Sequence, residues 1–172
     1  MRIVKELIPY VVIVLVVVLI RTFIATPVIV SGSSMDPTLK NGQLLILNKL
    51  AKKYTRDDIV VIDAKINGKK ERIVKRIIGL PGETLEYKNG FLYIDGKRTH
   101  DDFVNITRDF TLKNVTGKSK IPDGYYFVMG DNRTNSLDSR DSRVGLVKKN
   151  NIRLTKCIKK FINPVKNLFI LS

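Results

Sequence analysis

The hydrophobic pattern of the chain begins with one long apolar segment. Residues 7–20 carry no charge, and residues 7–26 carry one, at Arg21. A helix of about twenty residues spans about 30 Å, the thickness of the hydrocarbon core of a bilayer. Arg21 lies near one end, where its side chain can reach the headgroups, and Pro27 is typical of a helix stop. The pattern therefore predicts one transmembrane helix near the N-terminus.

This segment has two other interpretations. A buried core helix or strand pair could use such a run, but its valine content and N-terminal position argue against that. A cleaved signal peptide would also place basic residues, here Arg2 and Lys5, ahead of an apolar stretch. No convincing small-x-small cleavage site follows the run, so residues 7–26 are expected to be an uncleaved anchor after a short N-terminal segment, residues 1–6.

Beyond the anchor, the pattern changes to short aliphatic and β-branched runs bounded by polar residues, which is typical of strands. The expected strands are Gln43–Leu47, Asp58–Asp63, Arg72–Leu80, Thr84–Tyr87, Phe91–Ile94 and Gly124–Met129. Lys88-Asn89-Gly90 lies between two of them and is a strong hairpin signal. Between residues 30 and 150 there is no long amphipathic helix. The expected fold is therefore mostly β, with short antiparallel strands.

Two polar regions interrupt this pattern. Residues 101–120 are polar and irregular and are expected to form a flexible loop. The segment 148–172 contains no acid and alternates lysine or arginine with apolar residues. It is expected to be a basic tail that either packs on the domain or contacts anionic lipid headgroups. The expected organisation is thus residues 1–6, anchor 7–26, β domain 27–147 and tail 148–172.

Composition and charge narrow the chemistry. Among 172 residues, 31 Lys and Arg against 16 Asp and Glu give a net charge of +15. Such a charge implies an anionic neighbour, either nucleic acid or the surface of an anionic membrane. One cysteine, Cys157, excludes a disulfide framework, and one histidine, His100, excludes a multi-histidine metal site. A Ser-His-Asp triad is improbable for the same reason, so hydrolytic chemistry here needs another base.

The first segment with candidate chemistry is S-G-S-S-M-D-P-T-L at residues 31–39, just after the anchor. A serine on a glycine-containing turn, followed by a proline that restricts the chain, can be held exposed with its backbone N–H directed outward. Taken alone, such a segment is more often a serine-rich linker than the site of a nucleophile.

The second segment is the apolar strand R-I-V-K-R-I-I-G-L at residues 72–80. Lys75 shares one face of this strand with Ile73 and Ile77, and burying an ammonium group there is costly. Desolvation and the neighbouring Arg76 should both lower the pKa of this lysine. The alternative is an edge-strand lysine that protects against aggregation.

The third segment is G-D-N-R-T-N-S-L-D-S-R at residues 130–140, directly after an expected strand. It is dense in hydrogen-bond donors and acceptors, as in a turn that holds a polar network. Its composition alone also fits an ordinary Asx-turn loop.

In this order, the three segments resemble the motifs of the bacterial type I signal peptidases, membrane-anchored serine–lysine endopeptidases that remove signal peptides. The matches are S-M-x-P-T-L at residues 34–39, K-R-x-x-G-L-P-G at 75–82 and G-D-N-R-x-x-S-x-D-S-R at 130–140. With the anchor, the resemblance covers residues 1 to about 147. It implies an antiparallel β catalytic domain of the signal-peptidase type.

The resemblance also implies roles for single residues. Ser34 would be the nucleophile, Lys75 the general base and Ser136 the hydroxyl that orients the lysine amine. The implied supporting network and turn consist of Arg76, Asp131, Asn132, Asp138 and Arg140. Some family members carry an oxyanion-hole serine two places before the nucleophile; this chain has Gly32 there.

An extended substrate peptide would pair with exposed strand edges, near residues 27–32 and 72–75. The expected substrate-binding residues are Ile29, Val30, Ser31 and Ile73. No cofactor or metal is implied. The expected partners are signal peptides of secreted preproteins and membrane lipid, with the protein-export machinery nearby and no nucleic acid. The resemblance implies a single-pass protein of the cell membrane, with the N-terminus cytoplasmic and the catalytic domain outside.

Two alternatives stay open from the sequence. One is another serine–lysine protease, such as a self-cleaving repressor, against which the anchor argues. The other is a non-catalytic, membrane-anchored basic module that binds an anionic polymer, for which the charge would suffice. This chain has no tryptophan and no recognisable nucleic-acid-binding motif to support that alternative.

Overall fold

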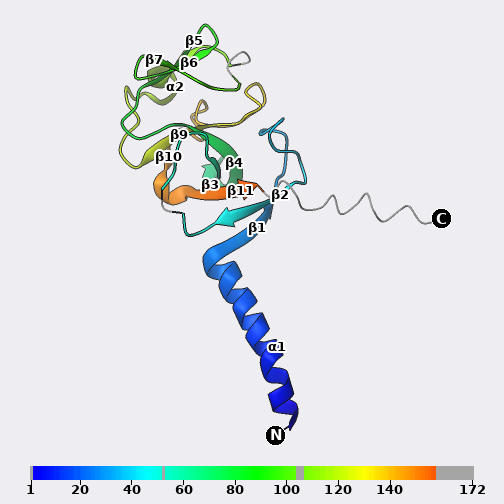
Figure 1. The fold of residues 1–172 in the computed structure, drawn as a ribbon. Helices are drawn as coiled ribbons and strands as arrows, with labels where there is room; N and C mark the ends of the chain where they lie inside the picture. The colour runs from blue at the N-terminus through cyan, green and yellow to red at the C-terminus, as the bar shows by residue number, and fades with distance from the viewer. Residues whose placement is uncertain (1, 52, 104–106, 158–172) are drawn as a thin grey trace, which may run out of the picture.

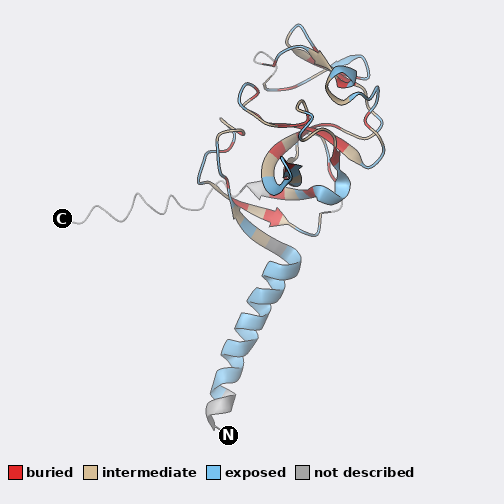
Figure 2. Ribbon diagram, turned by 180° about the vertical axis from the view of Figure 1, so that it is seen from behind, coloured by how far each residue is buried: buried red, intermediate tan, exposed pale blue. Residues whose placement is uncertain are grey.

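A computed structural model of the chain describes residues 2–51, 53–103 and 107–157. An apolar helix, α1 (Arg2–Leu19), continues through a π-helical turn, η1 (Ile20–Ile24), directly into the first strand, β1 (Ala25–Ile29) (Figure 1). The span Glu6–Ile24 is 19 residues long and apolar enough to cross a membrane. Its side chains are exposed throughout, which shows as continuous pale blue in Figure 2. The expected N-terminal apolar helix is confirmed.

The join between the helix and the β domain is fixed by hydrogen bonds. Lys49 Nζ donates to the carbonyl oxygens of Arg21 and Thr22, at 3.0 and 2.8 Å. The backbone N–H of Lys49 donates to the Ile24 carbonyl at 3.0 Å. These bonds satisfy carbonyl groups that the end of a helix leaves without partners.

The larger sheet has seven antiparallel strands in the order β1-β2-β11-β3-β4-β9-β10. After β1, its strands are β2 (Leu44–Asn48), β3 (Ile59–Ile66), β4 (Lys69–Gly79), β9 (Tyr125–Met129), β10 (Val147–Lys148) and β11 (Ile152–Cys157). A short 3₁₀ turn, η3 (Lys149–Asn151), joins the last two. The strands expected at 43–47, 58–63, 72–80 and 124–129 are all present.

Strand β11 was not expected from the sequence, which placed residues 148–172 in a basic tail. It lies inside the sheet, paired with β2 on one side and β3 on the other. Ile152 is fully buried, and Thr155 Oγ1 donates to the Ile59 carbonyl at 2.8 Å. This part of the expected tail therefore packs on the domain; residues 158–172 lie outside the described residues.

The smaller sheet has four strands in the order β7-β6-β5-β8. They are β5 (Leu85–Lys88), β6 (Phe91–Ile94), β7 (Lys97–Thr99) and β8 (Phe110–Thr111), and a short helix, α2 (Leu112–Thr116), follows the last. The expected hairpin at 88–90 is confirmed, because Asn89 and Gly90 have positive φ angles of 53° and 74° between β5 and β6.

The expectation of a flexible irregular loop over residues 101–120 was wrong for its second half. Thr111 caps α2 by accepting a hydrogen bond from the Asn114 N–H at 3.2 Å, and Leu112 is buried. Phe110 stacks between Tyr87 and Phe127, at centroid distances of 5.1 and 5.8 Å. The segment therefore packs the smaller sheet against β9 of the larger one.

Besides the outer edge of β10, two strand edges in the larger sheet have no strand beside them among the described residues. β1 is at the end of the strand order, and β9 pairs with β4 only at Arg76, Ile77 and Gly79. The preceding part of β4 therefore pairs on one side only, with β3. These free edges frame the candidate site.

Candidate active site

The turn that carries Ser34 is anchored by the buried side chains on either side of its tip. Met35 and Leu39 are each 1% exposed and pack with Val30 and Leu45 in a small apolar cluster. Burying these two apolar side chains holds the turn to the sheet at about 1.5–3 kcal/mol per side chain. Ser34 itself is only partly buried, so its hydroxyl stays available beside the cluster.

The segment 130–136 holds the backbone of this turn from the other side. The Asn132 N–H donates to the Ser34 carbonyl, and Asn132 Nδ2 donates to the Ser33 carbonyl, both at 3.1 Å. Asn135 Nδ2 also donates to Ser33 Oγ, at 3.3 Å. The first and third sequence segments are thus in direct contact, almost a hundred residues apart in the chain.

Close approach of these two segments requires a glycine at position 130. A Cβ atom there would lie 2.2 Å from Ser136 Oγ and 2.4 Å from the Ser34 carbonyl oxygen. Ser136 Oγ is buried and makes no hydrogen bond to any residue in the described ranges. The structure therefore places Ser136 near the Ser34 carbonyl, without the hydrogen bond from its hydroxyl to the Lys75 amine that the expected orienting role would use.

Lys75 lies on β4 with its side chain 2% exposed, and its Nζ is 2.8 Å from Ser34 Oγ, to which it donates a hydrogen bond. Burial lowers the pKa of Lys75 to about 8, against opposing contributions from Asp138 and Asp131. The sequence predicted that Arg76, the neighbour in the chain, helps to lower this pKa. In the structure the arginine that does so is Arg140. Near neutral pH the amine therefore has an appreciable uncharged population.

Two arginine–aspartate pairs surround this lysine. Arg76 donates to both carboxylate oxygens of Asp131, at 2.8 and 2.6 Å, and Arg140 donates to both of Asp138, at 2.8 Å each. Both aspartates are fully buried. Such bidentate pairs fix orientation as well as charge, so each carboxylate is turned toward an arginine.

A third buried arginine, Arg133, was not among the expected site residues. Its guanidinium donates to both carboxylate oxygens of Asp101, at 2.6 and 2.9 Å, to Thr107 Oγ1 at 3.0 Å and to the Gly130 carbonyl at 3.1 Å. It also donates to the Tyr87 hydroxyl at 2.8 Å. Arg133 therefore ties the segment 130–136 to the smaller sheet. The motif itself contained the arginine, but its partners Asp101 and Thr107 lie in a region that the sequence predicted to be a loop.

A cavity of about 290 Å³ opens beside Ser34. It contains all four expected peptide-binding residues: Ile29, Val30, Ser31 and Ile73. Its other walls are Val28, Met35, Val61, Arg72 and Val74. The cavity therefore lies between the free edges of β1 and β4, and it is mostly apolar.

No cluster of three or more histidine, cysteine, aspartate or glutamate side chains suited to a metal occurs in the described part of the chain. His100 is exposed, and its Nε2 lies within hydrogen-bonding distance of Asp102 Oδ1, at 2.9 Å. It makes no contact with Ser34 among the described interactions, whereas the Lys75 amine does.

The fold and these motifs place the chain in the class of anchored β-sheet peptidases, and comparison with known proteins specifies the family. A family model described as "Signal peptidase, peptidase S26" matches residues 3–157. The chain is 45% identical over 157 residues to a signal peptidase I of Bacillus caldolyticus, covering 84% of both chains. It is 45% identical over 150 residues to signal peptidase I S of Bacillus subtilis strain 168, covering 78% of this chain and 76% of that protein. This chain belongs to the signal peptidase family, peptidase S26.

A solved structure agrees with this assignment. The crystal structure of a signal peptidase I from Enterococcus faecalis V583 matches with a TM-score of 0.53 and 39% sequence identity. The match covers 58% of this chain and 93% of that one. The expected fold class is thereby confirmed.

The buried Arg133–Asp101 pair gives a stability prediction. Although burial alone would raise the pKa of Asp101, hydrogen bonds from Arg133 hold it below its usual value, so the carboxylate is charged at neutral pH. Asp101→Asn should lower the free energy of unfolding by about 3–5 kcal/mol, because it leaves the buried guanidinium without a counter-charge. Urea unfolding of the full chain in detergent measures this.

Asp102→Asn is the matched control, since Asp102 is 75% exposed and should change stability by less than about 0.5 kcal/mol. Adding Arg133→Gln to Asp101→Asn should recover part of the loss by removing the unpaired charge. Equal stability of the two single variants would contradict the assignment of this pair as a structural tie.

Proposed function

We propose that this chain is a membrane-anchored serine endopeptidase that removes signal peptides from exported preproteins, with Ser34 as nucleophile and Lys75 as general base. The observation that carries the proposal is the 2.8 Å contact between Lys75 Nζ and Ser34 Oγ, made by a lysine that is 2% exposed. A buried amine with a lowered pKa, next to a serine hydroxyl, is an arrangement that activates a nucleophile.

The reaction begins when the uncharged Lys75 amine accepts the Ser34 proton as Oγ attacks the scissile carbonyl. The C–N bond then breaks, protonated Lys75 gives its proton to the leaving amine, and an acyl-enzyme remains on Ser34. The same lysine takes a proton from the water molecule that hydrolyses this ester and passes it to the Ser34 oxygen as the acyl group leaves. Lys75 carries the proton in each step, so its amine must gain and lose a proton during turnover at the pH at which the enzyme is active.

The Ser34 N–H is the proposed oxyanion donor, a contribution of about 2.7–4 kcal/mol. It makes no hydrogen bond to another group in the described residues. Gly32 brings no hydroxyl, and its N–H donates to Asn41 Oδ1 at 3.0 Å. With φ at +93°, Gly32 turns the chain in a conformation that disfavours side chains.

The remaining site residues support the dyad in this proposal. The buried hydroxyl of Ser136 orients the lysine amine once the substrate is bound, a step in which catalytic hydrogen bonds commonly tighten. Asn132 holds the Ser34 turn. The supporting ion-pair residues are Arg76, Asp131, Asp138 and Arg140.

The substrate is an extended peptide that adds between the free edges of β1 and β4, where backbone hydrogen bonds align it. Ile29, Val30, Ser31 and Ile73 line the cavity that receives its side chains. We expect small residues at the first and third positions before the cut. The partners are signal peptides of preproteins and membrane lipid, with the export machinery nearby.

A non-catalytic membrane-anchored basic module is the rival function. It gives no reason to bury a lysine amine against a serine hydroxyl, which costs desolvation energy. Basic side chains that only bind a polymer or headgroups work best exposed. The Ser34–Lys75 contact therefore favours the catalytic proposal.

Replacing the nucleophile tests the proposal directly. Ser34→Ala should abolish cleavage of a preprotein in detergent while leaving thermal unfolding and membrane attachment unchanged. Ser33→Ala is the matched control and should keep substantial activity, because only the hydroxyl of Ser34 contacts Lys75. An inactive Ser33→Ala with an active Ser34→Ala would reverse the assignment.

The pH dependence tests the base. Because the pKa of Lys75 is lowered to about 8, kcat/KM should rise with pH up to about 8 and then level off. Lys75→Arg and Lys75→Met should both be inactive, since a guanidinium keeps its proton and a thioether accepts none. Activity in either variant would mean that another group is the base.

The same lysine makes stability depend on pH. Its folded pKa of about 8 lies below the unfolded value of about 10.4. Below about pH 8 the amine is charged in both states and folding bears the full cost of burying that charge. Between the two pKa values folding releases the proton, and the cost disappears as the pH rises past the unfolded value. Lys75→Met should therefore stabilise the chain by up to about 3 kcal/mol at pH 7 and by progressively less toward pH 10. Thermal unfolding at the two pH values measures the difference.

We also propose that the N-terminus is cytoplasmic and that the β domain lies outside the membrane, with Arg2 and Lys5 on the cytoplasmic side. Protease added to intact cells stripped of their wall should digest the β domain and leave a membrane-embedded fragment. Digestion only after the cells are permeabilised would show the opposite orientation.

A further inference from the structure

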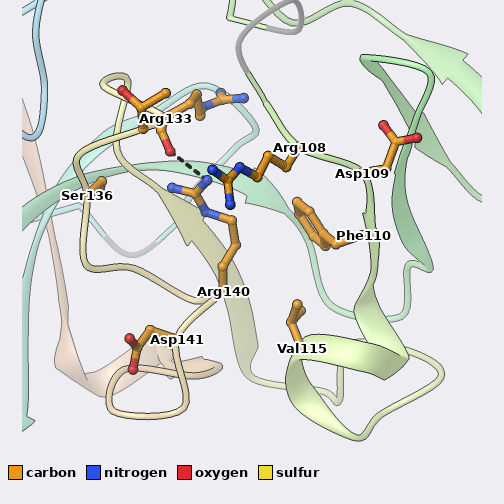
Figure 3. Close-up of a pocket in the computed structure, with 9 residues that line it drawn as sticks. Arg108, Asp109, Phe110, Val115, Arg133, Ser136, Arg140 and Asp141 are labelled. Atoms are coloured by element: carbon orange, nitrogen blue, oxygen red, sulfur yellow. Dashed lines mark hydrogen bonds between the residues drawn. The ribbon is translucent and has the colours of Figure 1, made fainter.

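A second cavity, of about 430 Å³, shares Ser136 and Arg140 with the candidate active site but none of the walls of the peptide cavity. Arg108 and Phe110 line it from the side of β8 (Figure 3). Thr134 also lines it, from the segment that carries Ser136. The proposed reaction assigns no role to this cavity.

The charge in this cavity is not balanced at its centre. Figure 3 shows the guanidinium groups of Arg108 and Arg140 directed toward one another. Arg140 has Asp138 as its counter-charge, whereas Arg108 is exposed and has no hydrogen bond or ion pair with any described residue. The third arginine of the wall, Arg133, is paired with Asp101.

Two carboxylates also line the cavity, but both are engaged elsewhere. Asp109 accepts hydrogen bonds from the backbone N–H groups of Asn89 and Gly90, at 2.9 and 3.2 Å. Asp141 is paired with Arg143, at 2.9 and 2.7 Å. In Figure 3 both carboxylates point away from the facing guanidinium groups. Two like charges therefore face the same space with no acid between them.

We propose that this cavity binds a phosphate group between the guanidinium groups of Arg108 and Arg140, and that its binding slows the peptidase. Guanidinium groups bind phosphate oxygens in a bidentate manner, and a doubly charged ion suits two of them better than a single carboxylate would. The ion also removes the repulsion between the two arginines. The binding site stands on its own, whereas the effect on rate rests on the proposed function.

The path from this cavity to the reaction is electrostatic. The charged groups that act on Lys75 are Asp138, Arg140 and Asp131, and of these only Arg140 lowers the pKa of the lysine. A phosphate beside Arg140 offsets that charge. If the ion also draws the guanidinium away from Asp138, it leaves a carboxylate that favours the ammonium form. Both effects raise the pKa of Lys75 and reduce the uncharged base at neutral pH.

Binding is tested with inorganic phosphate and the full chain in neutral detergent by calorimetry. Arg108→Gln should weaken binding by roughly tenfold or more, through loss of one charge-assisted contact. Lys97→Gln removes an equal charge from β7, outside the cavity, and should bind phosphate as the parent chain does. Equal binding by the two variants would overturn the site.

The effect on rate is tested by kcat/KM against pH, with phosphate or with chloride at equal ionic strength. Phosphate should raise the apparent pKa by about 0.5, which slows the reaction about threefold at pH 7 and leaves it unchanged at pH 10. Arg108→Gln should keep the basal rate and lose the shift. An unmoved profile despite calorimetric binding would overturn the coupling, and a chain without any peptidase activity would overturn the proposed function while the calorimetry still decides the site.

A phosphate group can come from solution or from a lipid headgroup, and vesicles separate the two. An Arg108-dependent shift with free phosphate in detergent identifies a soluble ligand. A shift that depends on Arg108 but occurs only in vesicles containing phosphatidylglycerol, and not in pure phosphatidylcholine, identifies a headgroup. Absence of the shift in every arm would overturn the proposal.

Discussion

The structure around the candidate site depends on one constraint, which is that a buried amine must be able to lose its charge. Lys75 is 2% exposed and lies 2.8 Å from Ser34 Oγ. Two fully buried carboxylates, Asp131 and Asp138, act to raise its pKa, and a direct ion pair with either would hold it as an ammonium. Each carboxylate is instead bound by an arginine through two hydrogen bonds. The arginines therefore occupy the carboxylates that could otherwise pair with the amine.

The pairing of each buried aspartate with an arginine restricts the rest of the segment 130–140. Buried ion pairs recover their desolvation cost only when their geometry is good, so the chain must hold Asp131 and Asp138 precisely. Gly130 lets the segment approach Ser34 more closely than any side chain would allow, and the Arg133 side chain donates a hydrogen bond to the Gly130 carbonyl. The smaller sheet thus supports the site without contributing a residue that touches Ser34. The contribution of the smaller sheet is to hold the segment 130–136 in position.

The sequence predicted most of the strands, because alternation and the Asn89-Gly90 turn are local signals. Residues of its three motifs lie together in the structure. The predictions from the sequence that the structure contradicts have a common cause. Strand β11 reads as a basic tail, because its neighbours β2 and β3 decide its pairing rather than its own composition. Asp101 lies in a polar region whose order comes from Arg133, 32 positions away in the chain. The arginine that lowers the pKa of Lys75 is likewise set by three-dimensional packing and not by sequence adjacency.

The free edges of β1 and β4 differ in how they are protected from other chains. Unpaired edges invite association with other chains, and proteins usually protect them with charge. The unpaired part of β4 begins with four exposed charged residues, Lys69, Lys70, Glu71 and Arg72, and only then reaches the apolar walls of the cavity. β1 has no such charge, and Ile29 is 70% exposed, but this strand follows directly from the membrane-spanning helix. In the proposed function, the bilayer surface restricts which chains can reach that edge, and a peptide already anchored in the same membrane reaches it most easily.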